Sequence, residues 1–354
     1  MRNRGIDLLK ISAMLAVVVL HVLKQGGVLG CVSIESINFD VAWLIECTAY
    51  SAVNCYAIVS GFVGIGARHK YTSIMLLWVQ VAFYTILTLI VFIIVFPDAV
   101  TKSAVIRALL PVMNADYWYF TAYFCLFFFM PFLNEGIKKM GKRELAIAVV
   151  VIGVLFSARG LFLYEDAFDL DEGYGVLWLI YMYIVGGFIK KHLEMNGKCR
   201  FLICFVICTL FNWFGEIGIT KYALADSNSF VGQAMSSLVS YTSPTMLISA
   251  VCLVVYFSKL SFKAKSIIKI IETLAPISFG VYLIHAEPLI WVNVLSGAFE
   301  FLASYHPVKL IGGVILISLS IFAVCIFIDF LRNKLFQLLR IKQHIGKIED
   351  RIIR

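Results

Sequence analysis

Long apolar runs, separated by short polar stretches, recur along the whole chain. Each run holds about twenty residues, the length with which an α-helix crosses roughly 30 Å of hydrocarbon. We therefore expect an all-α polytopic membrane protein with about ten transmembrane helices. The expected spans cover residues 6–24, 42–65, 72–96, 117–134, 144–163, 174–189, 200–219, 237–258, 273–295 and 308–331.

The composition agrees with a membrane protein. Hydrophobic residues make up 61% of the 354 residues and charged residues only 15%, whereas soluble proteins carry about 25% charged residues. No polar stretch is long enough for a second domain. We expect a membrane domain over residues 1–331 and a basic amphipathic tail over residues 332–354, which lies along the inner membrane surface. The first apolar run is too long for a cleaved signal peptide, so we expect it to remain as a helix.

The distribution of positive charge predicts the orientation. Placing the N-terminus inside brings most of the 30 Lys and Arg residues to the cytoplasmic side, as the positive-inside rule requires. An even number of spans returns the C-terminus to that side, so both termini are expected in the cytoplasm. The net charge of +8 then reflects topology, with membrane lipids as partners and no nucleic acid. Most of the nine cysteines fall inside spans, and their pattern predicts neither disulfides nor a metal site.

The first span carries two ionisable residues on one helix face. Lys10 and His21 are eleven positions apart, which amounts to about three turns and roughly 16 Å along the axis. An ionisable residue inside a membrane helix is costly to bury and marks a functional candidate. A neutral imidazole removes a proton from a hydroxyl or accepts an acyl group itself. We therefore expect His21 to be catalytic, with Lys10 as either a ligand for an anionic group or a positive-inside anchor.

Two further polar side chains are expected near His21. Glu46 lies near the outer end of the second span, at a depth similar to that of His21. There it either orients the imidazole, as the third member of a catalytic triad does, or is hydrated at the outer mouth. Asn54 lies two turns deeper and is the next side chain expected in the cavity.

Aromatic residues open the fourth span, and a second histidine lies in the ninth. Trp118, Tyr119 and Tyr123 form either an interfacial aromatic belt or a stacking surface for a sugar ring. His285 and Glu287 lie in a helix that we expect to break at Pro288, because proline interrupts helical hydrogen bonding. His285 is expected at the depth of His21, as either a catalytic or acceptor-binding residue or a structural one.

Four longer segments carry a family resemblance. They read GIDLLKISAMLAVVVLH, NCYAIVSGFVGIG, YWYFTAYFCLFFFMPFLN and ISFGVYLIHAEP. Each resembles a signature segment of the integral-membrane acyltransferase-3 family, and they occur in that family's order over nearly the whole chain. Lys10 and His21 match its basic residue and histidine, which are separated by ten residues, and His285 ends its second histidine motif.

The resemblance implies an O-acyltransferase of a bacterial plasma or inner membrane. Such an enzyme takes an acetyl group from cytoplasmic acetyl-CoA and passes it to a hydroxyl of a cell-surface polysaccharide, such as capsule or exopolysaccharide, or of its lipid-linked sugar precursor. It needs no permanently bound cofactor.

The resemblance also implies donor-binding residues. Many members carry two arginines, three apart, near the start of the third span, whereas this chain reads RHKYTSIMLLWVQ there. The donor contact is therefore expected from Arg68 and Lys70, together with Lys10 and Arg4. His21 and Glu46 are expected to be catalytic, and the acceptor is expected to contact Asn54, Trp118, Tyr119, Tyr123, His285 and Glu287.

A transporter is the main alternative, since buried His21, Glu46 and His285 also suit a proton or substrate path. The spacing of Lys10 and His21, which a CoA donor explains, and the lack of matching broken helices in two halves favour the enzyme. A structural partner in a polysaccharide assembly complex would leave the buried polar residues unexplained.

Overall fold

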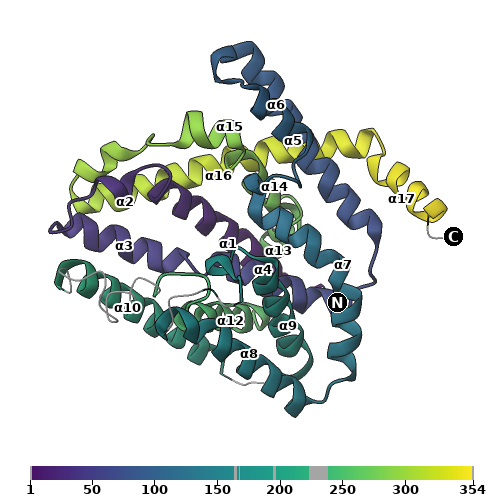
Figure 1. Ribbon diagram of the computed structural model, residues 1–354, viewed down its shortest axis with the longest axis horizontal. Coiled ribbons are helices and arrows are strands. Elements are labelled where there is room, and N and C mark those ends of the chain that lie inside the picture. The colour runs from purple at the N-terminus through teal and green to yellow at the C-terminus, as the bar shows by residue number, and fades with distance from the viewer. Residues whose placement is uncertain (1, 163–165, 167, 194–196, 223–237, 353–354) are drawn as a thin grey trace.

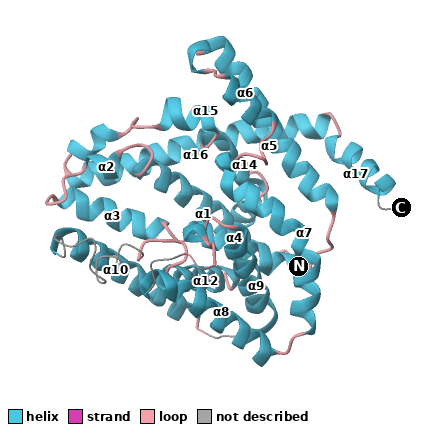
Figure 2. Cartoon of the chain, viewed as in Figure 1, coloured by secondary structure: helices cyan, strands magenta, loops and turns pink. Residues whose placement is uncertain are grey.

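Every regular element in the described part of the chain is helical (Figure 2), which confirms the all-α class. The computed structural model describes residues 2–352 except 163–165, 167, 194–196 and 223–237 (Figure 1). The helices are α1 (Arg4–Leu23), α2 (Val28–Cys31), α3 (Ile37–Ala49), α4 (Ala52–Gly64), α5 (Tyr71–Val95), α6 (Lys102–Leu109), α7 (Trp118–Lys139), α8 (Lys142–Phe162), α9 (Val176–His192), α10 (Lys198–Tyr222), α12 (Pro244–Ser258), α13 (Lys265–Leu274), α14 (Ser278–His285), α15 (Pro288–Ile290), α16 (Pro307–Leu338) and α17 (Ile341–Ile352).

Among the described residues, five helical segments are long and apolar enough to cross a membrane, and α13 with α14 makes a sixth if that pair, bent by 41°, is one span. The chain is therefore a multi-pass membrane protein. The expected span over 42–65 consists of two 13-residue helices, α3 and α4, which are interrupted at Tyr50 and Ser51. Helices α9 and α12 have 17 and 15 residues, shorter than a straight crossing needs.

Helix α1 lies at the centre of the bundle. It contacts α3, α4, α12, α13, α14 and α16, which surround it in Figure 1. The most apolar part of the segment Arg4–Cys31 is 56% buried, against 17% for those of α10 and α16. The helix that carries Lys10 and His21 is therefore an interior helix, whereas α10 and α16 present apolar side chains outward, as lipid-facing helices do.

Glycines bring α4 and α9 into close contact. A Cβ atom on Gly61 would lie 2.0 Å from the carbonyl oxygen of Tyr183, and one on Gly186 would lie 2.0 Å from that of Ile58. Small residues allow such approach between membrane helices. The SGF segment of α4 thus packs backbone against backbone with α9.

A buried ion pair ties α16 to α5 and α14. Asp329 is completely buried and binds the Arg332 guanidinium at 2.7 Å. Its Oδ1 also accepts hydrogen bonds from Tyr84 at 2.6 Å and Gln80 at 3.0 Å, both on α5. On α14, a Cβ at Gly280 would lie 2.2 Å from Asp329 Cγ. The ion pair between Asp329 and Arg332 is therefore part of a larger network that also includes Tyr84 and Gln80.

The C-terminal tail packs against α5. Helix α16 runs past the expected boundary at residue 331 without interruption, and α17 follows it. The Glu349 carboxylate of α17 accepts hydrogen bonds from the backbone N–H groups of Tyr71 (2.9 Å) and Thr72 (3.0 Å) and from the Thr72 hydroxyl. These bonds cap α5, and the one from the Thr72 hydroxyl is the main reason why the pKa of Glu349 is lowered.

We expect Asp329→Asn to lower the free energy of unfolding by roughly 3–5 kcal/mol, because it leaves a buried guanidinium without its counter-charge. The measurement is reversible unfolding in mixed micelles. Glu135→Gln, which removes an exposed ion pair with Lys138, serves as the control and should change stability little. Equal stability of the two variants would contradict the role assigned to the network.

Candidate functional site

Two histidines from opposite ends of the chain meet in the interior. His21 Nδ1, on the last turn of α1, lies 2.8 Å from His285 Nε2, at the end of α14. His285 Nδ1 in turn lies 2.6 Å from the carbonyl oxygen of Val281. His285 is 4% exposed, and the rings of His21 and Trp291 pack perpendicular to each other with centroids 4.6 Å apart.

This chain of contacts selects one arrangement of protons for the neutral pair. A carbonyl oxygen only accepts hydrogen bonds, so His285 donates from Nδ1 to Val281. A neutral His285 then accepts at Nε2, and His21 must donate from its Nδ1. The Nε2 atom of His21 is left with its lone pair. It is therefore placed to take a proton or to attack a carbonyl, and it can gain a proton without breaking the bond to His285.

The sequence around His285 explains its position. Helix α14 ends at His285, and Pro288 starts α15, so the break predicted at Pro288 is confirmed. Glu287 Oε2 caps α15 by accepting from the backbone N–H groups of Leu289 (2.9 Å) and Ile290 (3.2 Å). The Glu287 side chain therefore stabilises the turn after His285. It also lines a side cavity of about 310 Å³, together with Tyr117 and Arg107 among other residues.

Two larger cavities lie on either side of the histidine pair. The inner cavity, of about 520 Å³, is lined by Lys10, Arg68, His69 and Lys70 among other residues. The outer cavity, of about 440 Å³, is lined by His21, Lys24, Gln25, Glu46, Tyr50, Arg107, Asp116, Trp118, Tyr174, Tyr241, Tyr282 and Trp291 among others. The inner cavity is therefore basic at its mouth, and the outer one combines aromatic rings with charged groups.

A much smaller space, which we call the middle chamber, lies between them and has a volume of about 40 Å³. It shares Tyr56, Tyr119 and Phe279 with the inner cavity. It shares His21 and Tyr282, among others, with the outer cavity. His21 therefore faces both the middle chamber and the outer cavity.

The structure brings three predicted donor residues together and separates the fourth. Lys10, Arg68 and Lys70 line the inner cavity. Arg4 forms an exposed ion pair with Glu272 of α13, at 2.9 Å. Lys10 Nζ also lies 3.8 Å from the Asp7 carboxylate, so it takes part in an ion pair while lining the cavity.

Glu46 lines the outer cavity together with His21. It is 2% exposed, and its Oε2 has no hydrogen-bond partner among the described residues. The hydrogen-bonding position on the imidazole that the sequence suggested for Glu46 is taken by His285. The unpaired carboxylate oxygen is itself buried, although the Glu46 side chain lines the outer cavity.

The side-chain amide of Asn54 is hydrogen-bonded to two other residues of the protein. Its side-chain amide donates to the Tyr241 carbonyl oxygen at 2.8 Å and accepts from Trp178 Nε1 at 3.0 Å. It is buried, at 1% exposure. Asn54 thus holds Tyr241, which lines the outer cavity, and its polar atoms are used in doing so.

The three predicted aromatic residues of α7 line the cavities in order along the helix. Trp118 lines the outer cavity and the middle chamber. Tyr119 lines the middle chamber and the inner cavity, and Tyr123 lines the inner cavity. Helix α7 therefore forms a wall along all three spaces.

Sequence reasoning missed Tyr56 and Tyr241. The Tyr56 hydroxyl donates to the carbonyl oxygen of Lys10 at 2.8 Å and lies 3.3 Å from Ser278 Oγ, so it joins α4 to α1 and α14. The Tyr241 ring packs at 5.8 Å from that of Trp118. Tyr56 lies within the segment NCYAIVSGF, which is a signal in its favour, whereas Tyr241 precedes α12 in a stretch without a motif.

Comparison with known proteins gives one family. The model of an acyltransferase domain matches residues 3–330, which include every cavity-lining residue named above. No curated protein and no solved structure matches the chain.

We expect ¹⁵N NMR of histidine-labelled protein in bilayers to show His21 with a protonated Nδ1 and an unprotonated Nε2 at neutral pH. The His21 signals are assigned by their loss in His21→Ala. In His285→Ala the acceptor for Nδ1 is gone, so the two tautomers should become mixed. A His21 that carries its proton on Nε2 in the unmutated protein would refute the proton arrangement.

Proposed function

Since the chain belongs to the acyltransferase 3 family and is therefore an acyltransferase, we propose that it moves an acetyl group from cytoplasmic acetyl-CoA to a hydroxyl of a cell-surface polysaccharide or its lipid-linked sugar precursor. The observation that carries this proposal is the position of His21, whose ring lines both the middle chamber and the outer cavity. A group that reacts at this ring is reached from both sides of the bundle.

The proposed reaction uses the lone pair on His21 Nε2. The acceptor hydroxyl gives its proton to Nε2 while its oxygen attacks the thioester carbonyl, and the carbon–sulfur bond breaks. The proton then passes to the leaving thiolate, so that CoA and an O-acetyl ester are formed. In a two-step relay the same Nε2 would carry the acetyl group before the hydroxyl arrives. His285 stabilises the imidazolium in either case by keeping its bond to Nδ1.

The charge of the inner cavity supports a CoA donor. Lys10, Arg68 and Lys70 come from α1 and the loop before α5 and line one space. Phosphate groups bind such clusters of cations through charge-assisted hydrogen bonds. The roughly 16 Å between Lys10 and His21 along α1 is on the scale of the pantetheine arm, which would carry the thioester inward.

The lining of the outer cavity supports a carbohydrate acceptor. Trp118, Tyr174 and Tyr241 present aromatic faces there, and Glu46 and Gln25 add polar groups. Apolar and aromatic walls with a few convergent polar groups are typical of small-molecule sites. The unpaired oxygen of Glu46 supports a contact with a sugar hydroxyl.

We also propose that the bundle crosses a bacterial plasma or inner membrane about ten times, with both termini in the cytoplasm. In that topology, each of the ten expected apolar runs corresponds to a helix or a broken helix of the fold. The run 42–65 is broken into α3 and α4, and the run 273–295 into α14 and α15. Helices α3, α4 and α14 contact α1 and bring Glu46 and His285 to its outer end.

The test uses purified protein in lipid nanodiscs supplied with radiolabelled acetyl-CoA. We expect His21→Ala to reduce hydrolysis or transfer of the label by at least about a hundredfold, since general acid–base catalysis alone contributes that much. His344→Ala, on the exposed side of α17, is the control. Activity in His21→Ala equal to that of the unmutated protein would reject the mechanism. No activity in both the unmutated protein and His344→Ala would reject acetyl-CoA as the donor.

Substitution at the inner cavity should act on the donor. We expect Lys10→Ala and Arg68→Ala each to raise KM for acetyl-CoA by about tenfold or more, because a contact with a charged phosphate is lost, with kcat less affected. Lys138→Ala, an exposed cation on α7, should leave KM unchanged. Steady-state kinetics at two salt concentrations measure KM for acetyl-CoA separately from kcat. An unchanged KM in both Lys10→Ala and Arg68→Ala would contradict the assignment of the inner cavity as the donor site.

A further inference from the structure

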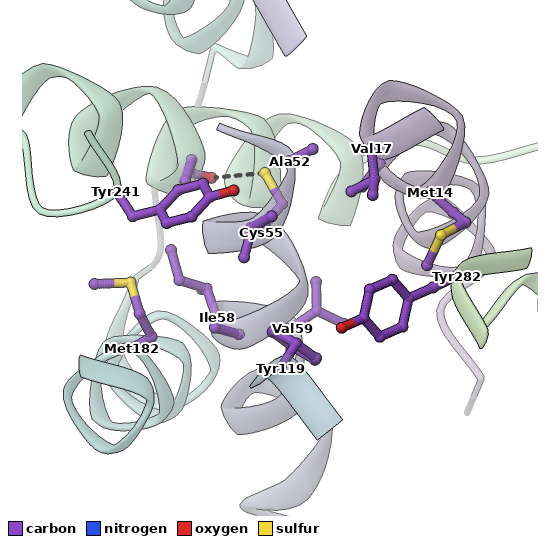
Figure 3. Packing of buried hydrophobic residues seen from close by; sticks show 14 of the residues in the cluster. Met14, Val17, Ala52, Cys55, Ile58, Val59, Tyr119, Met182, Tyr241 and Tyr282 are labelled. Atoms are coloured by element: carbon purple, nitrogen blue, oxygen red, sulfur yellow. Dashed lines mark hydrogen bonds between the residues drawn. The ribbon is translucent and has the colours of Figure 1, made fainter. Parts of the chain in front are cut away.

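The middle chamber is lined differently from the cavities on either side. Met14, Val17 and Val53 line it and belong to neither neighbouring cavity. They are buried, with exposed fractions of 3%, 6% and 9%. Met14 and Val17 project from α1 toward α4, and the ring of Tyr282 lies beside Met14 (Figure 3). The chamber therefore has an apolar wall, part of it on the same face of α1 that carries His21.

We propose that the middle chamber receives the acyl group of the donor and restricts it to acetyl, with Met14, Val17 and Val53 as the residues that set this limit. This inference rests on the proposed acyltransferase function and adds the residues that select the donor. Its apolar lining suits a hydrocarbon group, since burying a methyl group there removes apolar surface from water. A sugar ring would leave its hydroxyls without partners among these three side chains.

The volume of the chamber fits an acetyl group. Holding one water molecule takes roughly 10–15 Å³ of such a cavity, so a chamber of about 40 Å³ has room for three or four groups of that size. An acetyl group has three non-hydrogen atoms, and a hexanoyl group has seven. Each methylene beyond the third or fourth non-hydrogen atom therefore needs space that buried side chains occupy.

Both ends of the chamber agree with this assignment. Toward the inner cavity, the rings of Tyr56, Tyr119 and Phe279 form a neck, with Tyr119 centred 6.4 Å from Tyr56 and 6.5 Å from Phe279. Toward the outer cavity, the chamber ends at His21. A thioester that enters through the neck therefore places its acyl group beside the imidazole, and the bulk of CoA stays in the inner cavity.

The experiment measures CoA release from acetyl-, propionyl-, butyryl- and hexanoyl-CoA by full-length protein in nanodiscs. We expect turnover to fall by about tenfold or more for each added methylene once the chamber is full, which is the discrimination that an apolar pocket achieves. Val17→Ala and Met14→Ala enlarge the chamber and should raise butyryl-CoA turnover relative to acetyl-CoA by about tenfold. Val17→Leu should lower acetyl-CoA turnover.

Val18→Ala is the matched control, because Val18 is a completely buried valine of α1 that lines none of the three spaces. It carries the same loss of volume and should keep the unmutated ratio of acetyl to butyryl turnover. Equal ratios in Val17→Ala and Val18→Ala, or equal turnover of acetyl- and hexanoyl-CoA by the unmutated protein, would overturn the assignment while acetyl-CoA turnover persists. Absence of acetyl-CoA turnover in the unmutated protein would instead refute the proposed function, and this inference with it.

Discussion

The contact between His21 and His285 is the constraint around which this fold is organised. Two imidazoles buried in an apolar bundle need hydrogen-bond partners, because an unsatisfied polar group is costly to bury. Here a single acceptor, the carbonyl oxygen of Val281, ends the chain of donors. The pair holds only if α14 stays against α1, and the buried ion pair of Asp329 beside Gly280 contributes to this from the opposite side of α14. Distant elements thus share in placing one reactive nitrogen.

The positions of the inner and outer cavities also follow from the central position of α1. Helix α1 runs from the inner cavity at Lys10 to the outer cavity at His21. Helix α7 also lines the inner cavity, the middle chamber and the outer cavity. A basic inner cavity and an aromatic outer cavity suit two different ligands, which would meet only at the imidazole. Catalysis of transfer requires both reactants within contact distance of one group, and the two-sided exposure of His21 provides that position.

Much of this site was predictable from local sequence, and the remainder depended on packing. The shared helix face of Lys10 and His21 follows from helical geometry alone, and the end of α14 follows from Pro288. The pairing of His21 with His285 spans 264 positions and depends on the bend between α13 and α14, which no local pattern encodes. For the same reason, the assignments of Asn54 and Arg4 to ligand contacts did not anticipate that each has a distant partner within the protein. Glu287, also assigned to a ligand contact, instead caps the adjacent helix through local hydrogen bonds.

The small volume of the middle chamber also has a physical consequence that is independent of the proposed selection of the donor. Two cavities of about 520 and 440 Å³ that opened freely into each other would leave a hydrated path through the bundle, and such a path leaks ions and protons. Close packing of apolar side chains removes the partners that water needs. Met14, Val17 and Val53, with the ring of Tyr119, line this narrow space, and Met14 and Val17 lie on the Lys10 side of His21 along α1. An acyl group is one of the few chemical groups that are small and apolar enough to enter such a constriction, so under the proposed function the barrier between the two sides and the position of group transfer coincide.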